Sequence, residues 1–360
     1  RNWITMELSG LATVAAAWPE FRAAPAWMDY AVARLGHELA LQVYPDGVHK
    51  ELTSGYHGVA LRNFAELDDV CRRAGHPLPD AYARGLEAMY GYLARSMRPD
   101  GTNPLNSDSD RNDQRPHVRA AAERFGRPDW TYIVSGGAEG RPPNGPPSAA
   151  LRWAGQLVSR SGWDRGAHWS FLDVGPWGTG HQHNDKLHLS VHAGGRDLLV
   201  DSGRFAYDGP LAERFRQPYA LHARGHNVLL LDGCGQGPGP KEAAAPLGQA
   251  DCRIAGEWDF ARGAVDTFED LLGRVRHTRA VLYLRGALWI VLDRVQTDRP
   301  REVTALWHFS PTCTVARDGT AVYTTDAGQT NLRIQPACPE PGAWTVELVQ
   351  ARNGPPPQGW

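Results

Sequence analysis

The sequence predicts an α+β protein of more than one domain, in which a helical half precedes a half rich in β-strands. Three stretches before residue 100 carry apolar residues at three- and four-residue spacing, the periodicity of a helix with one buried face. From about Trp163 onward the apolar residues come in short runs interrupted by Gly and Asp, as in an antiparallel meander or sandwich. A segment rich in Pro and Gly, residues 135–148, separates the two patterns and indicates a boundary.

The helical half is predicted from residues 26–44, 58–75 and 80–97. Gly75 closes the second of these stretches and is expected to be its C-cap. Asp80 follows the segment HPLP and is expected to be the N-cap of the third stretch. The connecting segments, residues 44–57 and 98–113, look like functional loops, so stacked helical hairpins are expected.

The β half is predicted from five short runs: residues 168–175, 186–203, 226–233, 280–296 and 303–310. Together with the preceding helices, these runs predict a helical domain, a linker and a β domain with a two-layer core. The expected boundaries are 1–134 for the helical domain, 135–162 for the linker with the first β segment, and 163–360 for the β domain. No repeat of fixed period indicates a solenoid.

Composition narrows the possible partners. The 360 residues are 42% hydrophobic and 22% charged with a formal net charge of −2, which gives no argument for nucleic acid or for an anionic membrane surface. No apolar run approaches the roughly 20 residues of a membrane helix. The five cysteines contain no CxxC pair, so neither a zinc finger nor a disulfide framework is expected, although Cys234 and Cys252 are one conceivable pair. Oligomeric state stays open.

Histidines crowd into residues 178–192, GTGHQHNDKLHLSVH. On an extended strand His181, His183 and Asp185 would share one face, because side chains alternate along a strand. With Asp201 and His226 further on, imidazoles and a carboxylate from neighbouring strands indicate a three-ligand cation site, with zinc the first candidate. The alternatives are surface or hydrogen-bonded sheet histidines, or a cupin-like barrel site.

Residues 180–207 and 214–233 resemble the β domain of the heparinase II/III-like polysaccharide lyases. Residues 1–21 and 44–57 are similar to the catalytic end of that family's helical domain, closest to the heparinase III type. The resemblance implies an incomplete α/α toroid followed by an antiparallel β super-sandwich. It also implies β-elimination on an acidic, uronate-containing polysaccharide, and a periplasmic or secreted bacterial enzyme of which this chain is a fragment.

The resemblance also implies catalytic residues. Asn2 would neutralise the uronate carboxylate, because the C5 proton is too weakly acidic while that charge persists. Tyr56 and His181 would act as acid and base, from the helical half and the β half respectively. From the residues alone, Asn2 could equally be a helix N-cap and Tyr56 a packing residue.

The remaining candidate residues fall into two groups. A divalent metal, expected to be zinc with calcium or manganese as alternatives, would have a structural role and be held by His183, Asp201 and His226. Substrate contacts are predicted for four residues: Glu51, His57, Asp185 and Arg214. Glu51 and His57 would belong to the cleft wall without a defined chemical role, and Asp185 would orient an imidazole or a backbone turn.

Three other functions stay open. One is an alginate or other uronide lyase of the same fold, although Trp3 stands where alginate lyases tend to have histidine. A second is a non-catalytic, metal-stabilised carbohydrate-binding protein. A third is a cupin-like redox metalloenzyme that uses His181, His183 and His226. A glycosidase would need two facing carboxylates, and no feature of the sequence pairs two of them.

Overall fold

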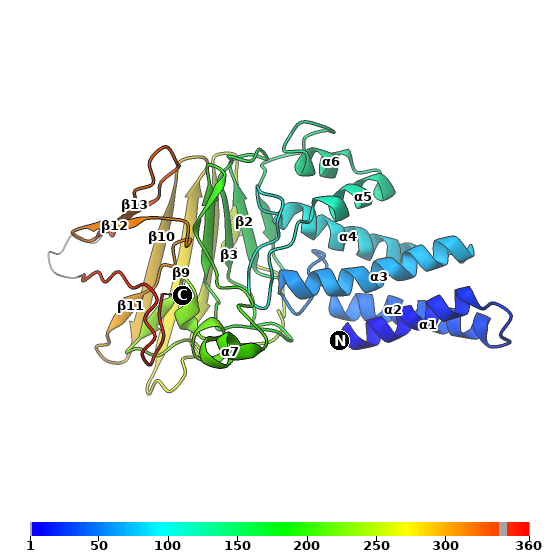
Figure 1. Cartoon of the computed structure of the whole chain (residues 1–360), viewed down its shortest axis with the longest axis horizontal. Coiled ribbons are helices and arrows are strands. Elements are labelled where there is room, and N and C mark those ends of the chain that lie inside the picture. Colours follow the sequence, from blue (N-terminus) through cyan, green and yellow to red (C-terminus); the bar gives the residue numbers. More distant parts are fainter. Residues whose placement is uncertain (1, 338–343, 360) are drawn as a thin grey trace.

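The computed structural model describes residues 2–337 and 344–359, with the side chain of Asn2 outside the described part. The helices form one half of the molecule and the β-sheets the other, and the helix axes run toward the sheets (Figure 1). The last helix of the helical half ends at Val134, and the first strand begins at Ala149. Residues 135–148 therefore contain neither helix nor strand.

Six helices build the helical half: α1 (Asn2–Ala17), α2 (Ala24–Gln42), α3 (Ser54–Ala74), α4 (Asp80–Ser96), α5 (Arg115–Phe125) and α6 (Pro128–Val134). Antiparallel neighbours α1 and α2 form a hairpin, and α3 packs against α1. Their apolar faces meet in one buried core that includes Leu35, Phe64 and Met89. The predicted helical periodicity is therefore the pattern of this shared core.

The ends of α3 and α4 follow from local chemistry. Thr53 caps α3, because its Oγ1 accepts the backbone N–H of Tyr56. Gly75 ends α3 in the left-handed conformation with φ 67°, as predicted, because glycine has no Cβ to strain there. Asp80 is the first residue of α4 and Pro79 is the N-cap, so the predicted N-cap is wrong by one residue.

The β half contains fourteen strands within the described residues: β1 (Ala149–Leu151), β2 (Gln156–Arg160), β3 (Trp169–Asp173), β4 (Leu189–Ala193), β5 (Arg196–Leu199), β6 (Leu229–Leu231), β7 (Cys252–Ile254), β8 (Trp258–Val265), β9 (Val275–Leu284), β10 (Leu288–Thr297), β11 (Val303–Ala305), β12 (Val315–Asp318), β13 (Ala321–Thr324) and β14 (Arg333–Ile334). All pairings between these strands are antiparallel. The two larger sheets are β1-β2-β3-β4-β5 and β10-β9-β8-β7.

The first sheet is covered on both faces, which is why every position of β2, β3 and β4 is buried. One face packs on the second sheet, with Leu172 and Val281 in the same core. The other face meets the helices, since the indole N–H of Trp169 donates to the carbonyl of Ser96 at the end of α4. In β9 buried positions alternate with partly exposed ones, as expected for a strand with one buried face.

The histidine-rich segment is a loop, contrary to the prediction of an extended strand. Residues 178–188 contain no strand, and β4 begins only at Leu189. His181 has a φ of 58°, a left-handed conformation that is uncommon for any residue except glycine. His181 and His183 therefore do not share a strand face, and what brings them together is a common hydrogen-bond partner described below.

A second irregular segment connects β5 to β6. It contains a short turn of helix, α7 (Gly209–Leu211), a π-helix, η1 (Ala212–Ala220), and a 3₁₀ turn, η2 (Ala223–Gly225). In Figure 1, α7 lies at the lower edge of the β half. Pro218 lies inside η1 and has no N–H for a regular helical ladder. π-Helical turns are rare and concentrate at functional sites, which draws attention to η1.

The two halves are joined by specific contacts. The carboxylate of Asp46 accepts the backbone N–H groups of Trp153 and Ala154 at 2.8 and 3.1 Å, and Tyr44 stacks on Trp153. The backbone N–H of Thr179 donates to the carbonyl of Lys50.

No helix among the described residues is long and apolar enough to cross a bilayer. Of the cysteines, the four outside 338–343 are unpaired.

Candidate functional site

The centre of the candidate site is a stacked pair of rings from the two halves of the molecule. Tyr56 lies in the first turn of α3, and His181 lies in the loop of residues 178–188. Their ring centroids are 3.4 Å apart with an interplanar angle of 12°. The His181 side chain keeps 33% of its surface exposed, so it can reach a ligand. A contact this close requires both halves, since neither supplies both rings.

Asp108 lies beneath this pair and accepts hydrogen bonds from four side chains. His181 Nδ1 lies 3.2 Å from one carboxylate oxygen, His183 Nε2 lies 3.0 Å from the other, Arg216 Nη2 lies 2.8 and 3.0 Å from the two, and Tyr207 donates at 3.1 Å. Burial by itself would raise the pKa of Asp108, but the bonds from His181, His183 and Arg216 outweigh it and hold that pKa well below its usual range. Asp108 is therefore an ionised carboxylate that only accepts.

The ionised Asp108 determines the tautomers of both histidines. Because a carboxylate only accepts, the hydrogen on His181 lies on Nδ1, and its Nε2 keeps a lone pair. In the same way the hydrogen on His183 lies on Nε2, and its Nδ1 keeps a lone pair. The lone pair of His181 is available to a substrate proton, and that of His183 is available to a cation.

A chain of hydroxyl groups extends from the same carboxylate. Tyr207 donates to Asp108, so the Tyr56 hydroxyl at 2.9 Å must donate to the oxygen of Tyr207. Burial first, and then the neighbouring Tyr56 and Asp108, raise the pKa of Tyr207 and keep this phenol protonated. The guanidinium groups of Arg204 and Arg216 both lie 4.6 Å from the Tyr207 ring.

The candidate cation site lies next to the stacked pair, since His183 shares Asp108 with His181. Ligand atoms of His183, Asp185 and His226 all lie within 4.8 Å of one another, and all three residues are buried. His183 Nδ1 and His226 Nε2 are buried atoms without a hydrogen-bond partner. Unpartnered buried nitrogen atoms are costly, and a divalent cation would satisfy both at once.

Asp201 belongs to an overlapping group made of His188, Asp201 and His226. Its carboxylate accepts from His226 Nδ1 at 2.9 Å, and this directs the His226 Nε2 lone pair away from it. His188 has no free nitrogen, since its Nδ1 accepts the backbone N–H of Asn227 and its Nε2 lies 2.8 Å from Ser190 Oγ. The predicted trio is thus divided between two groups that share His226, and the first group contains the two buried nitrogen atoms without a hydrogen-bond partner.

Comparison with known proteins identifies this architecture. A model of the heparinase II/III N-terminus matches residues 1–129, and a model of the heparinase II/III-like C-terminal region matches residues 143–353. The second match alone covers more than half of the chain. The chain belongs to the heparinase II/III-like family.

Relatives of known function give the same assignment. The chain is 27% identical to a heparin-sulfate lyase of Pedobacter heparinus over 326 residues, which cover 88% of this chain and 48% of that protein. It is 23% identical over 300 residues to a heparin-sulfate lyase of Bacteroides stercoris, covering 82% of this chain and 43% of the relative. The chain therefore spans about half the length of the curated relatives it matches.

Solved structures confirm the predicted fold class. A heparan sulfate lyase from Pedobacter heparinus superimposes with a TM-score of 0.78 at 25% identity, covering 91% of this chain and 51% of the other. A heparinase III structure gives a TM-score of 0.80 at 24% identity, covering 92% of this chain and 52% of the other. The heparinase II/III-like fold here is a partial α/α toroid followed by an antiparallel β-sandwich domain.

Of the residues predicted to contact substrate, three lie inside this heparinase II/III-like structure. His57 is buried, accepts the backbone N–H of His49 and bonds the carbonyl of Met89 at 3.1 Å; burial lowers its pKa to about 3. It belongs to the helical core and not to a cleft wall. Glu51 is buried against the loop that carries His181, close to Gly180. Asp185 is buried in the candidate cation site.

Arg214 is the fourth predicted substrate contact, and it is exposed on η1 over the ring of Phe215. It lies two residues before Arg216, which reaches Asp108. The position of Arg214 is compatible with an anionic ligand. The predicted partner of the uronate carboxylate, Asn2, begins α1, and its side chain lies outside the described residues.

The sequence did not predict three residues of the site: Asp108, Tyr207 and Arg216, which bonds Asp108. The segment 98–113 was recognised as a functional loop, but it contains Asp100, Asp108, Asp110 and Asp113 without any periodicity that distinguishes them. A left-handed Ser107 directly before Asp108 is the local feature that turns this one carboxylate inward. No sequence pattern reports such a turn.

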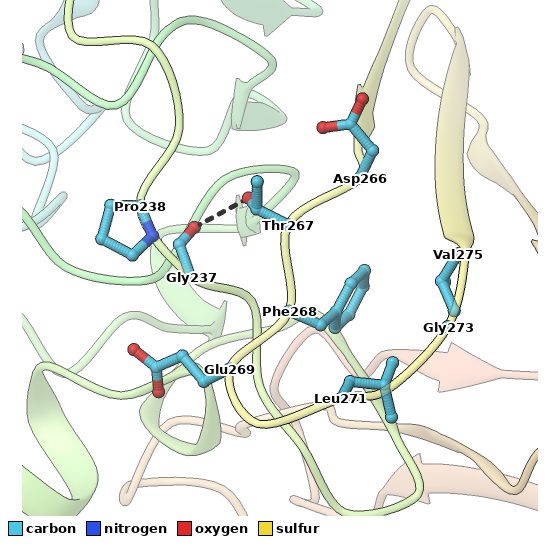
Figure 2. Close-up of a pocket in the computed structure, with 9 residues that line it drawn as sticks. All are labelled: Gly237, Pro238, Asp266, Thr267, Phe268, Glu269, Leu271, Gly273 and Val275. Carbon is cyan, nitrogen blue, oxygen red and sulfur yellow. Dashed lines mark hydrogen bonds between the residues drawn. The ribbon is translucent and has the colours of Figure 1, made fainter.

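A larger pocket lies elsewhere in the β half. It has a volume of about 350 Å³ and is lined by residues 237–238 and 266–269 together with Leu271, Gly273 and Val275 (Figure 2). Carboxylates in its lining do not suit an acidic polysaccharide. Glu269 accepts a hydrogen bond from Asn184, next to His183, so this pocket borders the histidine loop.

Proposed function

We propose that this chain carries the catalytic region of a polysaccharide lyase that cleaves heparan-sulfate-type glycans by β-elimination. The observation that carries the proposal is the stacked Tyr56–His181 pair, held from below by Asp108. The relatives named above support the substrate class. The arginines around the pair, Arg204, Arg214 and Arg216, suit carboxylate and sulfate groups.

The proposed reaction breaks two bonds of the uronate and forms one double bond. A base removes the proton at C5, electrons form the C4=C5 bond, and the C4–oxygen bond breaks. An acid then protonates the leaving oxygen. His181 Nε2 has the free lone pair needed for the base, and Asp108 stabilises the imidazolium that forms.

Tyr56 is the proposed acid. Its hydroxyl donates to Tyr207 when no substrate is present, so it must rotate toward the glycosidic oxygen in the complex. Tyr207 cannot then supply a proton to Tyr56, because the Tyr207 hydroxyl donates its only hydrogen to Asp108. The uronate carboxylate is assigned to Asn2, whose amide can hydrogen-bond it as negative charge moves onto it in the transition state.

A divalent cation is proposed at His183, Asp185 and His226, with Asp201 orienting His226. Two imidazoles and a carboxylate favour zinc over calcium and manganese. When bound, the cation would supply structural cross-linking between the His181 loop and the segment before β6. An acidic extracellular polysaccharide also favours the periplasmic or secreted location.

The proposed function is tested by incubating the chain with heparan sulfate, heparin, alginate and unsulfated uronate polymers. The expected result is ultraviolet absorbance from an unsaturated uronide with the heparan-type substrates and little with alginate. Binding of the polymers without any absorbance change would instead support a carbohydrate-binding protein. Activity that requires a redox-active metal would support the cupin-like alternative.

Metal binding has its own prediction. Asp185→Asn removes a proposed ligand, and His226→Gln removes another, so each should lower the affinity for zinc by at least about 100-fold, because each ligand contributes directly. Asp201→Asn leaves the ligands in place and should cost about 10–100-fold, as is typical of groups behind a ligand. Zinc titration with a chromophoric chelator measures all three against the matched exposed variant Asp208→Asn. Unchanged zinc affinity in Asp185→Asn would contradict the ligand assignment.

A further inference from the structure

A second pocket lies between the helices and the first sheet, away from the catalytic pair. Its volume is about 140 Å³, and it is lined by residues 97–101 and 133–136 together with Arg115, Arg160, Trp163 and Arg165. Pockets for drug-sized ligands usually exceed about 300 Å³, and one water occupies about 30 Å³ of liquid. A pocket of this size suits a small ion and not a sugar.

The lining is strongly basic. Four arginines contribute to it, Arg98, Arg115, Arg160 and Arg165, and the single lining carboxylate is that of Asp100. Asp100 also forms an ion pair with Arg111, which is outside the lining, with 3.4 Å between Oδ2 and Nη1. The carboxylates near the pocket are therefore already engaged by other guanidinium groups.

Arg160 is the residue that requires an explanation. It is 2% exposed, and no ion pair joins it to any carboxylate within the described residues. Its guanidinium carbon lies 4.7 Å from the centre of the Trp163 ring, but its Nε has no hydrogen-bond partner, and its Nη2 reaches one distant acceptor, the carbonyl of Arg95 at 3.4 Å. A buried guanidinium without a counter-ion is among the costliest groups in a protein interior.

A second buried nitrogen points to the same conclusion. Arg98, 4% exposed, pairs with Asp197, but its Nε has no hydrogen-bond partner. His192 lies close by with an unpartnered Nε2, and burial first, then Arg98, Arg111 and Arg160, lower its pKa to about 4. The neighbourhood therefore has an unmatched guanidinium donor on Arg98 as well as on Arg160, and a positive potential. His192 adds no donor, because its hydrogen lies on the Nδ1 that faces Asp197.

We propose that this pocket binds one tetrahedral oxyanion, sulfate or phosphate, with Arg160 as the deepest ligand and Arg165 at the rim. The ion supplies the missing counter-charge for Arg160 and accepts from donors that otherwise have no partner. It cross-links α4, the α6 end and β2, at the base of the loop that leads to Asp108. The ligand is either the free ion or the sulfate group of a glycan that projects into the pocket.

The test titrates the full chain with sodium sulfate and sodium phosphate by calorimetry, at ionic strength held constant with sodium chloride. The expected result is saturable binding and a rise in Tm that chloride does not produce. Arg160→Gln should weaken the Kd at least about tenfold, because a charge-assisted bond is lost from a buried site. Arg165→Gln should weaken it about threefold, since that guanidinium is exposed. The matched control Arg294→Gln, on exposed β10, should change nothing.

The sulfate affinity of Arg165→Gln and the binding of sulfated and unsulfated disaccharides complete the test. If Arg160→Gln does not fold, the Arg165→Gln variant tests the site by itself, and an unchanged sulfate affinity in that variant contradicts the site. The absence of saturable binding by either ion also overturns it. A sulfated disaccharide that binds through Arg160, when its unsulfated counterpart does not, identifies the glycan sulfate as ligand. Binding of the inorganic ions alone identifies the free ion, and Arg160-dependent binding of the unsulfated sugar contradicts an oxyanion site.

Discussion

Tyr56→Phe is expected to abolish most turnover and to leave folding and glycan binding intact. The change removes one hydroxyl group, so the aromatic ring can keep its 3.4 Å stack on His181. What is lost is the proposed proton donor to the leaving oxygen, and general acid–base groups contribute about 10²–10⁴-fold. The expected loss in kcat is of that size, with KM changed less than about threefold, measured from the absorbance of the unsaturated product.

Two comparison variants make this result specific. Tyr30→Phe removes a hydroxyl from an exposed tyrosine on α2 and should retain full activity. Tyr207→Phe frees the Tyr56 hydroxyl from its partner at 2.9 Å and should reduce kcat much less than Tyr56→Phe. A Tyr56→Phe enzyme with near-normal kcat, combined with an inactive Tyr207→Phe enzyme, would transfer the acid role to Tyr207.

The fold was largely predictable because its signals are periodic. Helical spacing in residues 26–44, 58–75 and 80–97 corresponds to α2, α3 and α4, and the run 280–296 corresponds to most of the β9–β10 hairpin. These patterns arise from one-sided burial, which repeats along an element. The exact cap of α4 was missed, since proline and aspartate both suit the start of a helix.

The site was predictable only in part, because its geometry arises from irregular backbone. His181 adopts a left-handed conformation and η1 is a π-helix around Pro218, and neither follows from periodicity. The alternation of His181 and His183 predicted a shared strand face, whereas both histidines meet because both donate to Asp108. His57, next to Tyr56, points into the core because successive helical residues face different directions.

Asp108→Asn is expected to cause a loss of activity on the order of 10⁴-fold, as for the carboxylate that holds the catalytic imidazole in a Ser-His-Asp triad. The amide keeps the size of the carboxylate but offers only one accepting oxygen. Donors of His181, His183, Tyr207 and Arg216 point at the two carboxylate oxygens, so at least one donor would face an N–H group. His181 would lose the partner that keeps its hydrogen on Nδ1, and the free lone pair would no longer be directed to the cleft.

The same substitution should lower the free energy of unfolding by about 2–4 kcal/mol, because Arg216 would lose its buried counter-charge. Activity must therefore be measured where circular dichroism shows the variant fully folded. The matched control is Asp110→Asn in the same loop, whose exposed carboxylate pairs with Arg204 at 2.7 Å. It should keep kcat within about twofold and stability within about 1 kcal/mol.

The pH dependence separates the role of Asp108 from that of the base. Its pKa is lowered in the folded protein, so its stabilisation is complete above the unfolded value of about 3.9 and is lost only as the pH falls through the lower folded value. Any acidic limb of kcat/KM above about pH 5 must then belong to a group other than Asp108. If Asp108→Asn preserved the maximal rate, Asp108 would not fix the tautomer of His181, and the proposed holding role would be wrong.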